Sequence, residues 1–223
     1  MKKRSRWLPC RFLLHVVATL NLGYAVYYDY KYAELPAMAM ELRMVTPLGG
    51  KFKYLTFLNG LLQTGYYMLA LGYDLYPLPG LRQLRDYLLA SFVVPLGLTV
   101  SITFWTLCGV YGESIYLDFL DHIYPGWLNH TMHTLVVVYA LLEICLVPHQ
   151  YPQRNRGFTG VAIVMGCYLV WLNLVHYWTG IWIYPFLSAL LIPQRWFFFA
   201  LVVGLSFVYY LLGEQLNYAL WAQ

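Results

Sequence analysis

Residues 87–112 read YLLASFVVPLGLTVSITFWTLCGVYG, a run of 26 residues without a charge that lies between Asp86 and Glu113. A helix needs roughly 20 apolar residues to cross the hydrocarbon core of a bilayer. A run of this length and composition is therefore typical of a transmembrane helix.

Five more stretches between charged residues are long enough to span a membrane. One of them contains Glu143 near its end, where a helix tolerates a charge better than at its centre. Another ends near Tyr177, because Gly180 and Pro185 interrupt the helical pattern beyond that residue. The sequence predicts one all-α domain over 1–223, a multi-pass membrane bundle of about six transmembrane helices near 12–28, 54–73, 87–112, 128–146, 157–177 and 196–212.

The composition supports the same class of protein. Of the 223 residues, 61% are hydrophobic and 11% are charged, whereas soluble domains carry roughly 25% charged residues. The aromatic content of 19% and the long uncharged runs exclude a nucleic-acid partner. We expect an integral protein of the plasma membrane or an endomembrane, in contact with lipid, and the sequence leaves any protein partner unknown.

The distribution of lysine and arginine predicts the orientation. If both termini are cytosolic, the cytosolic side holds Lys2, Lys3, Arg4, Arg6, Arg11, Arg82, Arg85, Arg154 and Arg156. The other side then holds Lys31, Arg43, Lys51, Lys53 and Arg195. An excess of positive charge marks the cytosolic side, so we predict cytosolic N- and C-termini.

Polar residues inside these helices are few. Thr56, Asn59 and Gln63, at i, i+3 and i+7, form a polar stripe on the second helix. The fourth helix carries His130 and His133, and the fifth carries His176. Because the second and fourth helices run inward and the fifth runs outward, Thr56 and the three histidines are predicted to share the outer third of the bilayer.

Three interpretations of this group remain open from the spacing. A threonine hydroxyl beside an imidazole suits nucleophilic acyl transfer, because the base accepts the proton of the hydroxyl. The same side chains also serve as hydrogen bonds between membrane helices. Three imidazoles can bind zinc, although no HExxH motif or nearby carboxylate supports a metal here. Asn129 opens a glycosylation sequon that we expect to stay unmodified.

Five stretches, in order, carry a resemblance to a known family. They are KYLTFLN (53–59), YPGWLNHTMHT (124–134), HQYP (149–152), TGIWIYPF (179–186) and YLLGEQLN (210–217). The chain resembles the family of the androgen-induced protein and the androgen-dependent TFPI-regulating protein over nearly its whole length. That family consists of multi-pass membrane hydrolases that cleave fatty-acid esters of hydroxy fatty acids, with a threonine nucleophile and a histidine.

The resemblance implies that Thr56 is the nucleophile and His133 the base of a threonine-dependent carboxylic ester hydrolase, without metal or cofactor. His130, Asn59, His176, or the loop acids Asp118 and Asp121 are possible supporting residues. We expect the lipid substrate to enter from the bilayer, with Lys51 and Lys53 either binding its carboxylate or serving as topological anchors. The alternative is a non-enzymatic lipid-binding scaffold or small transporter.

Overall fold

The computed structural model describes residues 8–33, 46–111 and 124–221, and every regular element in these ranges is helical. The long single helices are α2 (Leu8–Tyr32), α4 (Leu55–Leu75), α10 (Arg154–Thr179) and α12 (Ile192–Trp221). Two further long segments contain a π-helical turn: α5 (Pro79–Leu88), η2 (Leu89–Val93) and α6 (Val94–Tyr111), then α8 (Gly126–His130), η3 (Thr131–Leu135) and α9 (Val136–Leu146). Two short helices, η1 (Gly50–Lys53) and α11 (Phe186–Ala189), complete the fold.

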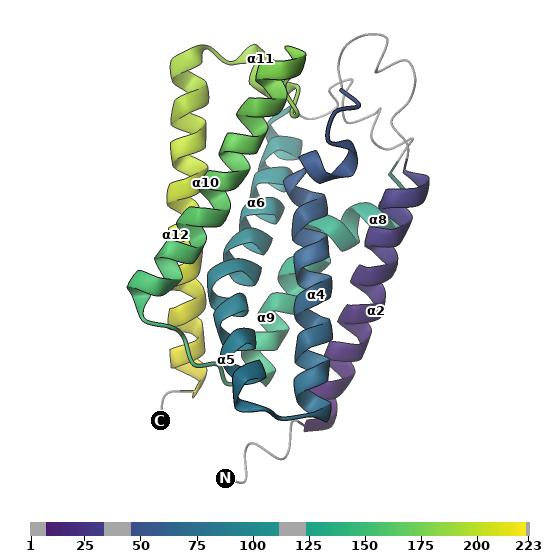
Figure 1. The fold of residues 1–223 in the computed structure, drawn as a ribbon, viewed down its shortest axis with the longest axis vertical. Helices are drawn as coiled ribbons and strands as arrows, with labels where there is room; N and C mark the ends of the chain where they lie inside the picture. The colour runs from purple at the N-terminus through teal and green to yellow at the C-terminus, as the bar shows by residue number, and fades with distance from the viewer. Residues whose placement is uncertain (1–7, 34–45, 112–123, 222–223) are drawn as a thin grey trace.

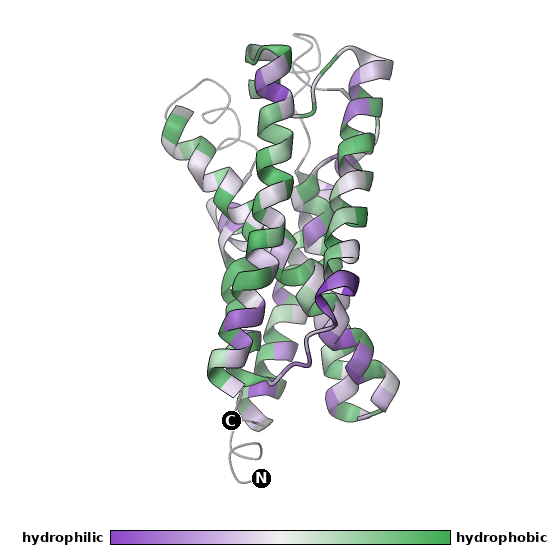
Figure 2. Ribbon diagram, turned by 90° about the vertical axis from the view of Figure 1, so that its left-hand side faces the viewer, coloured by the Kyte–Doolittle hydropathy of each residue, from purple (hydrophilic) through white to green (hydrophobic). Residues whose placement is uncertain are grey.

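These segments run side by side as a bundle (Figure 1). The prediction of an all-α membrane bundle is confirmed, because five stretches are long and apolar enough to cross a membrane: Pro9–Tyr32, Pro79–Val110, Gly126–Leu146, Arg154–Thr179 and Ile192–Trp221. Hydrophobic residues predominate along the long helices (Figure 2). Helix α4 is not among the five, since its polar stripe lowers its hydropathy. The expectation that the segment 54–73 spans the membrane, which would bring the number of spans to six, stays a prediction.

Helix α4 nevertheless lies inside the bundle, packed along α2 and against the π-helical turns of the two composite segments. Its side chains enter three apolar clusters, through Leu55, Phe57 and the tyrosines Tyr66 and Tyr67. The polar side chains of α4 are therefore turned toward other helices instead of lipid.

Pro95 explains one irregularity in the bundle. Proline has no N–H to donate, and its ring collides with the carbonyl group four residues earlier. The π-helical turn Leu89–Val93 ends two residues before Pro95 and includes Ser91, whose carbonyl group the ring would otherwise meet. Beyond the proline, α6 packs along α12, where the hydroxyl groups of Thr99 and Ser206 lie 2.9 Å apart.

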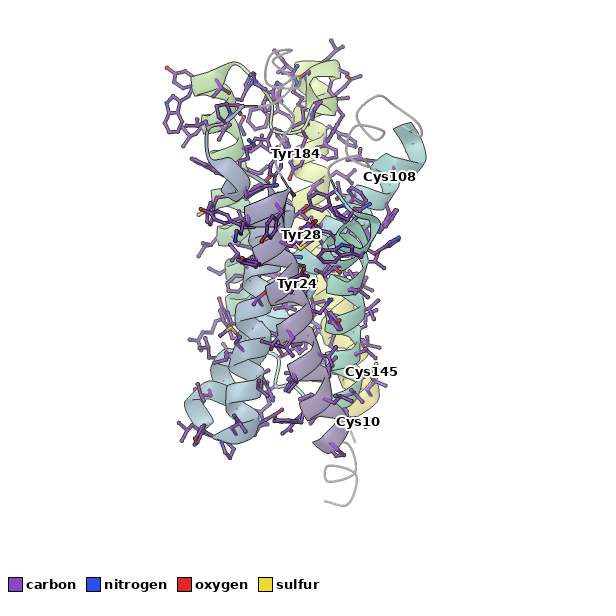
Figure 3. All side chains as sticks on the ribbon, turned by 90° about the vertical axis from the view of Figure 1, so that its right-hand side faces the viewer. Cys10, Tyr24, Tyr28, Cys108, Cys145 and Tyr184 are labelled. Atoms are coloured by element: carbon purple, nitrogen blue, oxygen red, sulfur yellow. The ribbon has the colours of Figure 1, made fainter. Side chains whose placement is uncertain are left out.

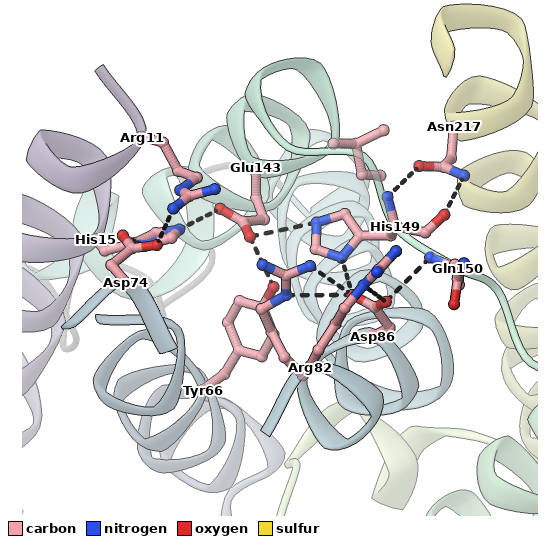
Figure 4. Close-up of polar contacts among 12 residues, drawn as sticks. Arg11, His15, Tyr66, Asp74, Arg82, Asp86, Glu143, His149, Gln150 and Asn217 are labelled. Atoms are coloured by element: carbon pink, nitrogen blue, oxygen red, sulfur yellow. Dashed lines mark hydrogen bonds and ion pairs between the residues drawn. The ribbon is translucent and has the colours of Figure 1, made fainter. Parts of the chain in front are cut away.

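The first and last described residues, Leu8 and Trp221, lie at the same end of the bundle (Figure 1). We call this the terminal end. A buried polar network centred on Glu143 joins the helices there (Figure 4). His15 donates to Glu143 at 2.8 Å, Tyr66 donates at 2.9 Å, and His149 Nε2 lies 3.3 Å from it.

Two more carboxylates extend the network on either side of Glu143. Asp74 lies 2.6 Å from His15 Nδ1 and 2.6 Å from a guanidinium nitrogen of Arg11. Asp86 lies 2.8 Å from His149 Nδ1 and 2.7 Å from Arg85. His15, Glu143 and His149 are at most 5% exposed. The network links α2, α4, α5, α9 and the segment that follows α9.

The helix ends differ in places from the predicted ones. The last helix, α12, continues to Trp221, well past 212. The third predicted helix begins at Pro79 instead of residue 87. Both extensions carry polar residues and lie at the terminal end of the bundle. Helix α10 stops at Thr179, where Gly180 adopts a φ of 69° that favours glycine. Several residues named in the sequence predictions lie outside the described residues: Lys2, Lys3, Arg4, Arg6, Arg43, Asp118 and Asp121.

Cysteine labelling tests the predicted orientation. The four native cysteines are first replaced; Figure 3 shows Cys10 and Cys145 toward the terminal end and Cys108 toward the opposite one. We expect single cysteines near Arg82 and Arg154 to react from the cytosolic side, and those near Arg43 and Asp118 to react from the other side. Labelling of the Arg43 and Asp118 loops from opposite sides would contradict the fold.

Candidate active site at the start of helix α4

The structure brings Thr56 and His133 together, although they are 77 positions apart. Thr56 Oγ1 lies 3.3 Å from His133 Nε2. Thr56 is in the first turn of α4 and is half-buried, whereas His133 is 7% exposed. The expectation that these two residues share one depth is confirmed, and their chemical roles remain predictions.

The His133 ring is held by groups that fix its orientation. Its Nδ1 lies 2.7 Å from Asn129 Oδ1 and 3.0 Å from the backbone oxygen of Asn129, and both oxygens are acceptors. The proton of a neutral imidazole is therefore on Nδ1, which leaves Nε2 as an acceptor that faces Thr56. Phe104 stacks on the ring, with centroids 3.6 Å apart and an angle of 14°.

His133 lies within the π-helical turn Thr131–Leu135. Such turns are rare, and they occur frequently at functional sites. Asn129 lies four residues before His133, one helical turn away, and its side-chain and backbone oxygens both reach the imidazole. From the sequence, Asn129 was interpreted only as part of a sequon.

Two tyrosine hydroxyl groups hold the start of α4. The backbone N–H of Leu55 donates to Tyr168 and Tyr184, both at 3.2 Å. Tyr168 donates to the backbone oxygen of Lys53 at 3.1 Å, and the two hydroxyl groups lie 2.8 Å apart. Burial raises the pKa of Tyr184, so its hydroxyl remains a donor. These contacts fix the position of Thr56, the next residue of the helix.

A glycine permits the close approach of the two helices that carry the site. A Cβ atom on Gly60 would lie 2.8 Å from Met132 Cε and 3.0 Å from a methyl group of Val26. Contacts below 3.0 Å require one of the groups to shift. Gly60 therefore lets α4 pack closely against η3 and α2, and this packing brings Thr56 within reach of His133.

Asn59 and Gln63 continue the polar stripe beneath Thr56, and both are 0% exposed. Gln63 Nε2 donates to Asn59 Oδ1 at 3.4 Å. Within the described part of the chain, Asn59 Nδ2 has no hydrogen-bond partner. The stripe therefore contains an unpaired buried donor close to the candidate nucleophile.

The two other predicted histidines have different partners. His130 is exposed, stacks on Trp105 with centroids 5.5 Å apart, and lies 3.3 Å from Thr134 Oγ1. His176 stacks on Trp182 at 3.8 Å. Among residues 8–33, 46–111 and 124–221, no three His, Cys, Asp or Glu side chains form a group suited to a metal ion. The zinc interpretation therefore has no geometric support.

The two predicted carboxylate-binding lysines are engaged within the protein. Lys51 Nζ lies 2.7 Å from Asp29 Oδ1. Lys53 is 1% exposed and donates to the backbone oxygen of Thr46. Burial, with the nearby charge of Lys51, lowers the pKa of Lys53 to about 8. Both ammonium groups therefore have partners within the protein, and a role in binding a substrate carboxylate stays a prediction.

This arrangement is suited to covalent acyl transfer. A hydroxyl group faces an imidazole nitrogen that accepts protons, and the opposite ring nitrogen is anchored by Asn129, as an orienting third group requires. A separation of 3.3 Å is compatible with catalysis, because such bonds often tighten only when substrate binds. The orienting group is an amide instead of an acid.

The helical bundle and its five apolar stretches define an integral membrane protein. Residues 10–218 match the family model described as FAR-17a/AIG1-like protein. The chain therefore belongs to the FAR-17a/AIG1-like family, and the resemblance noted from its five sequence stretches is confirmed.

Curated relatives agree with this assignment. The chain is 34% identical to the androgen-induced gene 1 protein of Homo sapiens, over 96% of this chain and 92% of that protein. It is 34% identical to the androgen-dependent TFPI-regulating protein of Homo sapiens, over 78% of each chain. The protein of that name from Mus musculus is 30% identical, over 91% and 90%. No solved structure matches the chain.

Proposed function

We propose that this protein is a membrane hydrolase that cleaves fatty-acid esters of hydroxy fatty acids, with Thr56 as nucleophile and His133 as base. One observation carries the proposal: Thr56 Oγ1 faces His133 Nε2 at 3.3 Å, while Asn129 holds the other ring nitrogen. The resemblance to the hydrolase family assigns the same two residues to the same roles.

The reaction proceeds in two halves. His133 Nε2 takes the proton of Thr56 while Oγ1 bonds to the ester carbonyl carbon. The resulting tetrahedral intermediate collapses, and the alcohol oxygen of the hydroxy fatty acid leaves with the proton from His133. A water molecule then gives a proton to Nε2 and attacks the acyl-threonine. The second collapse releases the fatty acid and returns the proton to Thr56.

The position of the site supports a lipid substrate. Ile102 and Trp105, on the part of α6 next to Phe104, are 42% and 39% exposed, and in a membrane these surfaces contact lipid. On the other side, Tyr24 and Tyr28 of α2 (Figure 3) both contact the Trp127 ring. Aromatic side chains of this kind are common at the membrane interface. An ester at this depth reaches Thr56 by lateral movement in the bilayer.

A fluorophosphonate probe separates this proposal from the lipid-binding scaffold or small transporter. The probe phosphonylates activated hydroxyl nucleophiles, so we expect covalent labelling of the native protein that disappears in Thr56→Ala. Absence of labelling and of ester hydrolysis in membranes that contain the native protein would favour the non-enzymatic alternative, in which Thr56 and His133 only join two helices.

Two conservative substitutions at Thr56 distinguish nucleophile from packing residue. Thr56→Ser keeps the hydroxyl group and loses one methyl group, so we expect measurable ester hydrolysis. Thr56→Val keeps the shape and loses the hydroxyl group, so we expect none above background. Hydrolysis rates for both variants, divided by the amount of inserted protein, give the comparison. Normal hydrolysis by the valine variant would end the nucleophile assignment.

A further inference from the structure

The polar stripe near the candidate site holds two buried side-chain atoms without a hydrogen-bond partner among the described residues, the donor Asn59 Nδ2 and the acceptor Gln63 Oε1. Asn59 is 0% exposed, and Nδ2 has no hydrogen-bond partner among the described residues. Buried donors in proteins are almost always paired, because an unpaired one loses its hydration without compensation. An unpaired donor in a candidate active site therefore suggests an acceptor that is present only during the reaction.

The orientation of the amide is set by its one hydrogen bond. Gln63 Nε2 donates to Asn59 Oδ1 at 3.4 Å, which assigns the oxygen to the side that faces Gln63. Gln63 itself is confined, because a Cβ atom on Gly97 would lie 2.9 Å from Gln63 Nε2. Gln63 lies one turn after Asn59 and Thr56 one turn before it. Thr56 and Asn59 therefore share one face of α4, and the N–H groups of the amide are the part that the bond to Gln63 leaves unused.

A structural role as a bond between helices does not account for this arrangement. Polar side chains in membrane bundles typically bond across helices. The hydrogen bond of Asn59 that the structure records connects two residues of the same helix, α4. It adds nothing to the association of α4 with its neighbours.

We propose that Asn59 is a catalytic residue, whose side-chain N–H donates a hydrogen bond to the oxyanion formed when Thr56 attacks an ester carbonyl. This inference rests on the proposed function and adds to it a hydrogen-bond donor for the oxyanion, which the pair of Thr56 and His133 does not supply. As Oγ1 of Thr56 bonds to the carbonyl carbon, the carbonyl π electrons move to its oxygen, and the resulting negative charge needs a donor. When the intermediate collapses, the charge returns to the carbonyl and Asn59 is again unpaired.

The position of Thr56 adds to this stabilisation. Thr56 is the second residue of α4, and the first N–H groups of a helix have no acceptor within it. The N–H of Leu55 donates to two tyrosines and that of Leu58 to Tyr54, so the groups that concern us are those of Thr56 and Phe57. These groups and the amide of Asn59 lie on the same end of α4 as the hydroxyl group. In a site that excludes water, such preorganised donors stabilise developing charge strongly.

The test compares Asn59→Leu with Gln63→Leu in the full-length protein, in membranes and with a fatty-acid ester of a hydroxy fatty acid as substrate. Removing one oxyanion donor typically lowers kcat by roughly 10²–10³-fold. We expect that loss in Asn59→Leu, with little change in KM. Gln63→Leu removes the hydrogen bond that orients the amide but keeps the Asn59 donor, so we expect a clearly smaller loss of kcat, of no more than about tenfold.

Thr56→Ala, measured in parallel, separates the two proposals. If Thr56→Ala retains activity, the proposed function is wrong and the role of Asn59 fails with it. If Thr56→Ala is inactive while Asn59→Leu stays within about threefold of the native kcat, only the oxyanion role is overturned. An equal loss of kcat in Asn59→Leu and Gln63→Leu also overturns it, because the shared defect would then be the broken hydrogen bond.

A second variant keeps the test valid if Asn59→Leu fails to fold. Asn59→Ala removes the Nδ2 donor and adds neither volume nor charge to α4. We expect folded protein, judged by its thermal unfolding in detergent, with a loss of kcat of at least about 100-fold. Folded Asn59→Ala with native kcat would overturn the proposal.

Discussion

Alanine at either Thr56 or His133 is expected to abolish ester hydrolysis. The first substitution removes the nucleophile, and the second removes a general base that typically contributes 10²–10⁴-fold to the rate. The double variant should be no less active than either single variant, because members of a catalytic unit act together. Hydrolysis of a fatty-acid ester of a hydroxy fatty acid in isolated membranes measures all three.

Matched variants on the same elements control for disruption of the bundle. Thr64→Ala removes a hydroxyl group of α4 that donates to the backbone oxygen of Gly60 at 2.8 Å, within its own helix. His130→Ala removes an exposed imidazole that faces Trp105 and Thr134. Both should insert normally and retain activity. More than about a tenth of the native rate in His133→Ala would require a different base.

Glu143→Ala is expected to cause the largest loss of stability among substitutions at the terminal end. The carboxylate interacts with His15, Tyr66 and His149, and it is 0% exposed. Truncation leaves three buried polar groups without their acceptor. Removing one partner from a buried charged network typically costs about 3–5 kcal/mol. Thermal or denaturant unfolding in detergent measures this change.

Leu142→Ala is the control for this substitution, because Leu142 is the neighbouring residue of α9 and is 41% exposed. Its truncation removes more apolar volume but leaves the network intact. We expect Glu143→Ala to be clearly the less stable of the two. Equal stability would mean that the network contributes little to the fold. Fluorophosphonate labelling per folded molecule should persist in both variants, because Glu143 lies at the opposite end from Thr56.

The sequence predicted the residues of the candidate site more completely than their arrangement. The direction of successive helices placed Thr56 at one depth with His130, His133 and His176, and the resemblance to a known family singled out Thr56 and His133. The role of Asn129 was missed because it was interpreted only as part of a sequon, although its spacing of four residues from His133 signals a contact on one helix face. The partners of Lys51 were missed because Asp29, 22 positions earlier, belongs to another helix.

What the sequence determined by itself is the class of structure. Apolar, uncharged runs of about 20 residues match the thickness of a bilayer. In lipid a helix forms all its backbone hydrogen bonds within itself, so these runs predict a helical membrane bundle whatever their neighbours are.

Only the tertiary structure decided which polar groups meet. Helical periodicity gives the depth of a side chain and its face, but not the rotation of one helix against the next. That rotation is set by close packing at Gly60, by Pro95 and by the two π-helical turns. It places Thr56 against His133, and it joins His15 to Glu143 across 128 positions of the chain.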